Sequence, residues 1–324
     1  MGEEIMRVGL IGGVGSSALT LKKLCDYGLN VVEVFGHQPK NTKFVSGHCN
    51  LEPFCLEHSI SFTPFVKINE YVEKIQALNL DFLFVVGISQ LVSKDIINAP
   101  KLGAIGFHPT KLPEGRGRAP LAWLVYEARE GAATFFMLEE AADAGAILAQ
   151  ESFEVSCEDN AKSVKDKIHE AMSVALDSLL PQLASGKLIA VEQDALMVTE
   201  FGIRKPEDGL IDWSYSAYDI DRLIKAASEP HPGAFTYSGM KKIEVKASRV
   251  ERDLKIKGVQ GRILKSNKDE FLVQTGDGLI WVSVIFDDSI KLRVGSLLGY
   301  KVELEIYELK KQIADLQELI RKIS

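Results

Sequence analysis

The chain has 324 residues, a formal net charge of −7 and the mixture of apolar and charged residues that is ordinary for a soluble globular protein. This length favours two domains over one. The acidic balance gives no general attraction to phosphate-rich partners, so nucleic acid or an anionic membrane would need a local basic patch, and only a weak one is present.

The cysteines and the N-terminus indicate a reducing compartment. No C-x-x-C pair and no ligand spacing with histidine occurs among the four cysteines, so reduced thiols and no metal are expected, and a metal cluster of Cys49 with the nearby histidines is the weaker alternative. Acidic residues precede the first apolar run, and no apolar run reaches the roughly 18 residues of a membrane span. We therefore expect a cytoplasmic protein. The cysteines are Cys25, Cys49, Cys55 and Cys157, and the histidines weighed with Cys49 are His37, His48 and His58.

Strand-like and helical segments alternate through the first half of the chain. The stretch "RVGLIGGVGSSALTLKKLCDYG" predicts a buried strand at Val8–Ile11, a glycine turn, and a helix capped by Ser16 or Ser17 that ends at Gly28. The apolar runs "NVVEVFG", "DFLFVVG" and "KLGAIGFH" follow, interleaved with the helical segments "YVEKIQAL" and "APLAWLVYEAR". This alternation predicts an α/β fold with a mostly parallel sheet covered on both faces, in which ligands bind beyond the carboxyl ends of the strands.

The pattern changes in the second half. A long amphipathic helix is expected at about 160–183, an aperiodic linker follows, and a short helix is expected at 217–227. Short strands then alternate with hairpin-type turns at Ser238-Gly239 and at Gly276–Gly278, which predicts a small β-barrel.

The last residues form a short heptad seam, in which apolar residues repeat with alternating steps of three and four between charged ones. Such a helix either associates with another copy of the chain or packs onto the chain's own body, and the pattern leaves both open. The seam residues are Ile306, Leu309, Ile313, Leu316, Ile320 and Ile323.

The glycine turn "GLIGGVGSS" lies where a dinucleotide-binding loop would lie, but its spacing from Gly9 is G-x-x-G-G-x-G. The acidic residue expected about twenty positions later is only loosely matched by Glu33. A nicotinamide site is therefore disfavoured. Contact of Gly12 and Gly13 with a ligand phosphate stays open, beside the simpler explanation that a tight turn needs glycine.

His108 is the most informative candidate for chemistry, because it ends a strand-like run and is followed by the loop "PTKLPEGRGRAP". Asp143 ends a second strand-to-loop segment, and Gly145 permits a tight backbone path there. A carboxylate beside an imidazole raises its pKa above the usual value of about 6.5 and makes it a stronger base. Either residue alone is more often structural or solvated.

Three stretches, "HPTKLPEGRGRAP", "DAGAILAQ" and "KPEDGLIDWSYSAYDIDRLIKAASEPHPGAFTYSGMKKIEV", resemble the formyltetrahydrofolate-dependent formyltransferases, which include methionyl-tRNA formyltransferase and amino-sugar N-formyltransferases. The resemblance spans most of the chain, from about Arg7 to Ile306. It implies formyl transfer from 10-formyltetrahydrofolate to an amine. The expected domains are a Rossmann-like catalytic domain at 1–187, a linker at 188–212, an OB-like barrel at 213–305 and a heptad helix at 306–324.

The resemblance also implies site residues. The family's catalytic histidine and aspartate correspond to His108 and Asp143, and the fixed loop Leu112–Pro120 would shape the same cleft. The family's usual asparagine, two residues before the histidine, is replaced by Gly106, so the oxyanion donor is in question. The implied folate-binding residues are Gly87, Ile88, Ser89, Gln90, Leu91, Leu138, Glu139, Glu140, Ala141 and Asp143. Residues expected at the acceptor or at an anionic part of either substrate are Gly12, Gly13, Lys40, Thr110, Arg116 and Arg118.

The loop after the second strand argues for a small acceptor. In tRNA-acting members this loop is strongly basic, whereas "GHQPKNTKFVSGHCNLEP" has only Lys40 and Lys43 against Glu52. An amino sugar carried on a nucleotide diphosphate is the favoured acceptor. The alternatives are initiator tRNA or another formyl acceptor, and a non-catalytic homologue that binds folate or a partner.

Overall fold

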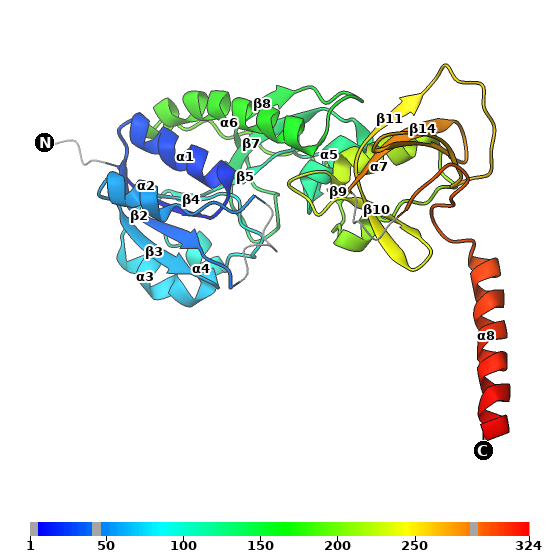
Figure 1. The fold of residues 1–324 in the computed structure, drawn as a ribbon. Helices are drawn as coiled ribbons and strands as arrows, with labels where there is room; N and C mark the ends of the chain where they lie inside the picture. Colours follow the sequence, from blue (N-terminus) through cyan, green and yellow to red (C-terminus); the bar gives the residue numbers. More distant parts are fainter. Residues whose placement is uncertain (1–5, 41–46, 286–290, 324) are drawn as a thin grey trace, which may run out of the picture. The chain divides into compact units, whose positions relative to one another are not determined.

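The computed structural model describes residues 6–40, 47–285 and 291–323, and the chain divides into two compact units, 1–204 and 205–324 (Figure 1). The division falls within the segment 188–212, which the sequence pattern predicts to be a linker. That segment holds the short strand β9 (Glu200–Phe201), which pairs in parallel with β6 (Arg116–Gly117).

The first unit is built on a seven-stranded sheet in the order β3-β2-β1-β4-β5-β7-β8. The first five strands of that order run parallel, and β7 and β8 are antiparallel to their neighbours. This confirms the predicted Rossmann-like, mostly parallel sheet. The strands are β1 (Arg7–Gly12), β2 (Asn30–His37), β3 (Ser61–Phe65), β4 (Phe82–Val85), β5 (Gly103–His108), β7 (Gly131–Met137) and β8 (Ile147–Phe153).

Helices cover both faces of this sheet because β1, β4 and β5 carry apolar side chains on both sides. Figure 1 shows α1 and α6 on one face and α3 and α4 on the other. The chain leaves β1 toward β2 on one side and returns to β4 on the other, so the strand order reverses between β1 and β4. Ligands bind at such a reversal in open α/β sheets. The helices are α1 (Gly15–Asp26), α2 (Glu52–Glu57), η2 (Ile68–Tyr71), α3 (Val72–Ala77), α4 (Lys94–Ile97), α5 (Pro120–Glu127), α6 (Ala161–Ala184) and η3 (Ala195–Met197).

The start of α1 differs from the prediction. Val14 is the N-cap residue, so the predicted cap at Ser16 or Ser17 is wrong. Ser17 acts instead from the third helical position, where its Oγ accepts hydrogen bonds from the N–H groups of Gly13 at 2.9 Å and of Val14 at 3.2 Å. The helix ends as predicted at Gly28, whose φ of +88° suits glycine at the end of a helix.

The second unit carries a five-stranded antiparallel sheet in the order β10-β11-β14-β13-β12. Its hairpin turns lie between Ser238 and Lys241 and between Gln274 and Leu279, at the predicted positions. The expected antiparallel unit is confirmed, and its closure into an OB-type barrel stays a prediction. The elements are η4 (Pro206–Gly209), α7 (Ala217–Ala227), β10 (Ala234–Ser238), β11 (Lys241–Glu251), β12 (Ile263–Asn267), β13 (Glu270–Gln274) and β14 (Leu279–Ile285).

The terminal helix α8 spans Val302–Ile323 and contains the predicted heptad seam. None of its described residues is buried. No helix within the described ranges is long and apolar enough to cross a lipid bilayer.

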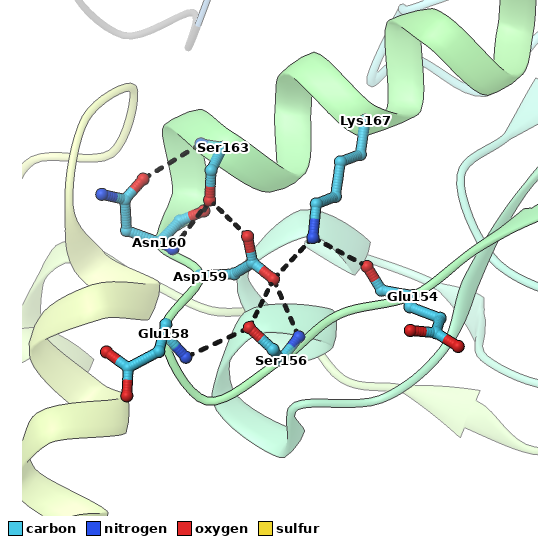
Figure 2. A network of polar contacts seen from close by, with 7 residues as sticks. All are labelled: Glu154, Ser156, Glu158, Asp159, Asn160, Ser163 and Lys167. Carbon is cyan, nitrogen blue, oxygen red and sulfur yellow. Dashed lines mark hydrogen bonds and ion pairs between the residues drawn. The ribbon is translucent and has the colours of Figure 1, made fainter.

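A polar network fixes the start of α6 (Figure 2). Asn160 is the N-cap, and its side chain accepts a hydrogen bond from the Ser163 N–H at 3.0 Å. Asp159 accepts hydrogen bonds from the Ser156 N–H at 2.8 Å, the Ser163 hydroxyl at 2.8 Å and the Lys167 ammonium at 2.7 Å. Burial opposes ionisation of Asp159, but these donors outweigh it and hold the pKa of the carboxyl at about 2.

We expect Asp159→Asn to lower the free energy of unfolding by about 1–2 kcal/mol at neutral pH, because the charge-assisted bonds are lost. The folded pKa of about 2 lies below the ordinary value of 3.8, so the unfolded chain binds the proton first and this stabilisation disappears as the pH falls from about 4 toward 2. Urea unfolding of both proteins across that range measures the difference. Asp166→Asn, at an exposed position of the same helix, is the control. A difference that persists unchanged in acid would contradict the assignment.

Candidate active site

A cleft of about 630 Å³ opens at the carboxyl ends of β4 and β5, within the first unit. This volume suits a small ligand or cofactor. The lining is mostly apolar, with polar groups from the loops after β4, β5 and β7. The lining residues are Ser16, Val85, Gly87, Ile88, Ser89, Gln90, Leu91, Val92, Ile97, Gly106, Phe107, His108, Pro109, Gly117, Arg118, Ala119, Pro120, Phe136, Leu138, Glu139, Glu140, Ala142 and Asp143.

His108 is the last residue of β5 and is only 6% exposed. Its Nε2 lies 2.9 Å from the carbonyl oxygen of Gly115, and its Nδ1 lies 3.7 Å from Oδ2 of Asp143. A carbonyl only accepts hydrogen bonds, so Nε2 carries the hydrogen and the neutral ring keeps its lone pair on Nδ1. The ring is therefore arranged to take up a proton on the side that faces the carboxylate.

Asp143 lies in the loop between β7 and β8 and has a φ of +55°, in the left-handed region that non-glycine residues rarely occupy. Its Oδ2 accepts a hydrogen bond from the Gly117 N–H at 2.9 Å. Its carbonyl oxygen accepts another from the side-chain amide of Gln193 at 2.8 Å. Side chain and backbone of Asp143 are thus held by two different segments of the chain.

The pKa of His108 is lowered from its ordinary value of 6.5 because burial disfavours the charged ring. Asp143 and the Gly115 carbonyl act in the opposite direction and do not overcome burial. The sequence-based expectation that Asp143 brings this pKa above the usual value is therefore wrong in its net direction. The consequence is a ring that is neutral, and able to act as a base, at neutral pH.

Gly106 lies opposite Phe136 of β7 and faces an apolar wall. A Cβ at this position would come within 2.7 Å of Leu138 Cδ2 and 2.9 Å of Phe136 Cζ. An asparagine here would force the Leu138 side chain aside. Glycine at this position thus goes together with Leu138, which occupies the space beside it.

The two predicted folate-binding segments lie along the cleft. Gly87 to Leu91 all line it, and Gln90 fixes that loop by accepting a hydrogen bond from the Ile68 N–H at 3.1 Å and donating one to the Val66 carbonyl at 2.7 Å. Of the second segment, Leu138, Glu139, Glu140 and Asp143 line the cleft, whereas Ala141 is exposed and is not among the lining residues. The Glu140 carboxylate forms an ion pair with Lys94.

The predicted acceptor residues are dispersed. Gly12, Gly13 and exposed Lys40 are not among the lining residues, although Ser16 of the same glycine-turn region is. Thr110 is buried and donates a hydrogen bond to the Gly115 carbonyl at 3.2 Å. Lys43, part of the argument against tRNA, lies outside the described residues.

The two arginines of the fixed loop differ. Arg116 donates hydrogen bonds to Gln193 Oε1 from Nε at 3.2 Å and from Nη2 at 2.7 Å. Arg118 is exposed and lines the cleft.

Glu33 and His48 make contacts within the protein other than the ligand contacts weighed from the sequence. Glu33 accepts a hydrogen bond from the Thr63 hydroxyl at 2.5 Å and one from Lys74 at 3.2 Å. His48 Nε2 lies 3.0 Å from the carbonyl oxygen of His37. Within the described residues, no group of three or more His, Cys, Asp or Glu side chains could hold a metal ion.

Sequence reasoning missed three residues near the predicted site. Gln193 lies in the segment predicted as a linker, and no local pattern connects it with Asp143 fifty positions earlier. Lys165 and His169 on α6 approach the N-terminus of α1, where a Cβ on Gly15 would lie 3.9 Å from Lys165 Cε and 3.2 Å from His169 Cε1. Burial and the nearby Lys165 charge lower the pKa of His169. Charged residues on an amphipathic helix normally face solvent, so the pattern alone gave no reason to choose these two.

Comparison with known proteins defines the class of this α/β enzyme. Residues 13–180 match the family model "Formyl transferase", and residues 204–298 match "Formyl transferase, C-terminal domain". Because the first match alone covers more than half of the chain, the chain belongs to the formyl transferase family. It is a formyltransferase.

Solved structures share this fold. An N-formyltransferase from Helicobacter canadensis, crystallised with folinic acid and dTDP-3-aminofucose, has a TM-score of 0.66 at 13% identity, with 86% of this chain and 100% of that chain covered. HypX from Aquifex aeolicus in complex with tetrahydrofolic acid has a TM-score of 0.62 at 17% identity, with 86% and 44% covered. Methionyl-tRNA formyltransferase from Clostridium thermocellum has a TM-score of 0.53 at 18% identity, with 76% and 94% covered. At these identities the likeness concerns the fold alone.

NMR can measure the pKa of His108 and the effect of Asp143 on it. We expect the pKa of His108 to lie below 6.5 in the native enzyme and to fall further in Asp143→Asn, because the variant keeps the burial and removes the charge that favours imidazolium. Histidine ring resonances measured against pH report both values, with His108→Gln as the assignment control. Asp166→Asn is the matched control, since Asp166 acts on His169. An unchanged His108 titration in Asp143→Asn would refute the pairing.

Proposed function

We propose that this enzyme transfers a formyl group from 10-formyltetrahydrofolate to the amine of a small acceptor, most readily a nucleotide-linked amino sugar. The observation that carries the proposal is the buried His108 ring, with its Nε2 hydrogen bonded to Gly115 and its Nδ1 facing Asp143 beside the cleft. In this arrangement the neutral His108 ring can accept a proton, and the Asp143 carboxylate faces the positive charge that results.

The cleft suits the folate donor. Its volume of about 630 Å³ accommodates a bicyclic ring, and residues of the loops 87–91 and 138–143 line it. A bound donor supplies the activated formyl group. The chain's own part is to hold that group beside His108 and to exclude water through the apolar wall of Ile88, Phe136 and Leu138.

His108 performs the proton transfer. Its Nδ1 accepts a proton from the amine as the amine nitrogen bonds to the formyl carbon, and in the charged ring Nε2–H donates to the Gly115 carbonyl while Nδ1–H faces Asp143. The same proton would then pass to the folate nitrogen as its bond to the formyl carbon breaks, which returns His108 to its neutral form. Both hydrogens of the imidazolium then have acceptors, so charge builds up in the buried ring at a reduced desolvation cost.

The formyl oxygen needs a donor other than the family's asparagine, since Leu138 and Phe136 occupy the space beside Gly106. Among the residues described as lining the cleft, Arg118 is the only arginine or lysine. We assign the stabilisation of negative charge to the Arg118 guanidinium as the donor, and protonated His108 adds its positive charge without a hydrogen bond, because both ring hydrogens face other acceptors. A positioned donor of this kind contributes roughly 10²–10³ in rate.

The acceptor's phosphates are assigned to the N-terminus of α1, where Lys165 and His169 approach Gly15. The N–H groups of Gly13 and Val14 are already bonded to Ser17 Oγ. The ammonium groups of Lys165 and Lys40, with the neutral His169 ring as a hydrogen-bond donor, would therefore make the main contacts in place of the predicted glycine N–H groups. A nucleotide diphosphate carries the charge that such a surface attracts.

Two alternatives remain as outcomes of an experiment. A tRNA acceptor would need many cations along its path, and the whole chain has a net charge of −7 with a weakly basic loop at 36–53. A homologue that binds folate without transferring a formyl group is the alternative that Gly106 keeps open.

The decisive assay incubates the enzyme with 10-formyltetrahydrofolate and either nucleotide-linked amino sugars or aminoacylated initiator tRNA, and detects the added formyl group by mass spectrometry. We expect formylation of a sugar amine and no gel shift with tRNA. Formylated tRNA would support the second acceptor class, and folate binding without any transfer would support the non-catalytic alternative.

The variant His108→Ala tests the role of the base. It should abolish nearly all transfer and keep folate binding, because it removes the base and leaves the cleft walls intact. Undiminished turnover of His108→Ala would refute the role of the base.

The heptad seam supports association of two copies of the chain through α8. Isoleucine occupies every a position of the helix, and leucine occupies its two central d positions, Leu309 and Leu316, a combination that favours parallel two-stranded coiled coils. In a parallel pair, Glu305 at a g position faces Lys310 of the second copy at the next e position. The a positions are Ile306, Ile313 and Ile320.

A single substitution tests this association. Ile313→Lys puts a charge into the centre of the seam, so we expect the chain to become monomeric at micromolar concentrations in sedimentation equilibrium. Lys311→Ala, at an f position outside the seam, should leave the mass of the assembly unchanged. A monomeric parent chain, or a variant that keeps the parent's mass, would contradict association through α8.

A further inference from the structure

A side chain from the segment after α6 joins the loop that carries Asp143. The side-chain nitrogen of Gln193 donates hydrogen bonds to the carbonyl oxygens of Asp143 at 2.8 Å and of Gly145 at 2.7 Å. These two carbonyls lie on either side of the turn through Ala144, so one amide group holds both ends of the turn together.

The other end of the same amide is also engaged. Gln193 Oε1 accepts hydrogen bonds from Arg116 Nε at 3.2 Å and Nη2 at 2.7 Å. The residue after Arg116, Gly117, donates its N–H to the Asp143 carboxylate at 2.9 Å. Gln193 therefore connects the backbone of the aspartate loop with the strand whose next residue holds the aspartate side chain.

This connection acts on a backbone that needs support. The φ of Asp143 is +55°, a strained conformation for a non-glycine residue that persists only where its surroundings hold it. Strand pairing holds Gly117, whose N–H binds the Asp143 carboxylate. On either side of Gly117, the N–H groups of Arg116 and Arg118 donate to the carbonyls of Thr199 and Phe201. The segment 193–201 thus supplies both a side chain and a strand to the region around His108.

We propose that Gln193 is a positioning residue, which holds the Asp143 loop so that the carboxylate faces Nδ1 of His108. The inference rests on the proposed role of the His108–Asp143 pair as base and partner. Gln193 does not line the cleft among the described residues, so it acts through Asp143 and not on the substrates.

Loosening the Asp143 loop has two measurable consequences, one for the pKa of His108 and one for the rate of transfer. The Coulomb attraction between the carboxylate and the imidazolium weakens as the carboxylate moves away, so loosening the loop disfavours protonation of His108. The groups that face the ring in the described structure are the Asp143 carboxylate and the Gly115 carbonyl. Misplacing a catalytic group by about 1 Å costs up to roughly 10²-fold in rate, with little effect on binding.

The test compares Gln193→Leu with Gln182→Leu. Gln182 also bridges backbone groups, since it donates to the Ser178 carbonyl at 3.1 Å and accepts from the Ile189 N–H at 3.1 Å, but it makes no contact with the Asp143 loop. NMR titration of His108 should move to lower pH in Gln193→Leu and stay at the parent value in Gln182→Leu. Transfer assays should show kcat reduced about 10–100-fold in the first variant, with a nearly unchanged KM for the folate donor.

Gln193→Asn keeps the amide but shortens its reach, so the pKa of His108 and the kcat of this variant should fall between those of the parent and of Gln193→Leu. The asparagine variant also provides the test if the leucine variant does not fold. A parent-like His108 titration in the folded variants would overturn the proposal, as would a loss that appears only in KM. The titration needs no acceptor. A shifted titration in a protein that transfers formyl to no amine would therefore reject the proposed function while leaving the positioning role of Gln193 intact.

Discussion

The chemistry proposed for the site depends on one hydrogen bond, from Nε2 of the buried His108 to the carbonyl oxygen of Gly115. This bond fixes the tautomer and directs the free lone pair of Nδ1 toward Asp143. Burial alone would give a neutral ring with no means of holding a proton. The carbonyl and the carboxylate supply acceptors for both hydrogens of the imidazolium, so the ring is neutral before the reaction and supported once it is charged.

Two features of the loop 115–118 keep this hydrogen bond in place. Gly115 and Gly117 have φ values of +73° and +102°, and a Cβ on Gly117 would lie 2.6 Å from the carbonyl oxygen of Phe201. The glycines therefore allow the loop to lie close against β9. The loop that orients His108 is in turn held by a residue 84 positions later, Thr199, so the proposed catalytic site depends on the segment after α6.

The sequence predicted the parallel sheet, α6, α7 and the hairpins because each is encoded by residues close together in the chain. The periodicity of Asn160–Leu183 and the apolar runs of β4 and β5 are local signals of this kind. The resemblance to formyltransferases directed attention to His108 and Asp143. The cap at Val14 was missed because Ser17 bonds backward to N–H groups that precede the helix.

The sequence could not predict the contact of Gln193 with the Asp143 loop, or that the pKa of His108 is lowered, and the reason is a different one. Both depend on distances between segments far apart in sequence and on the extent of burial, and neither has a local pattern. A carboxylate beside a histidine suggests a raised pKa only if the pair is partly solvated. At 6% exposure the desolvation of the ring is the larger effect, and only the folded structure provides that fraction.

The change at Gly106 shows how packing and chemistry are coupled in this site. Leu138 reaches into the space that the family's asparagine side chain would need, and it also lines the cleft beside the proposed folate wall. Because an amide at 106 and a leucine at 138 compete for the same volume, a substitution at 106 alone introduces a steric conflict together with the donor. The absence of an amide donor at 106 and the apolar wall at 138 therefore go together, and the role of either residue is defined only with the other in place.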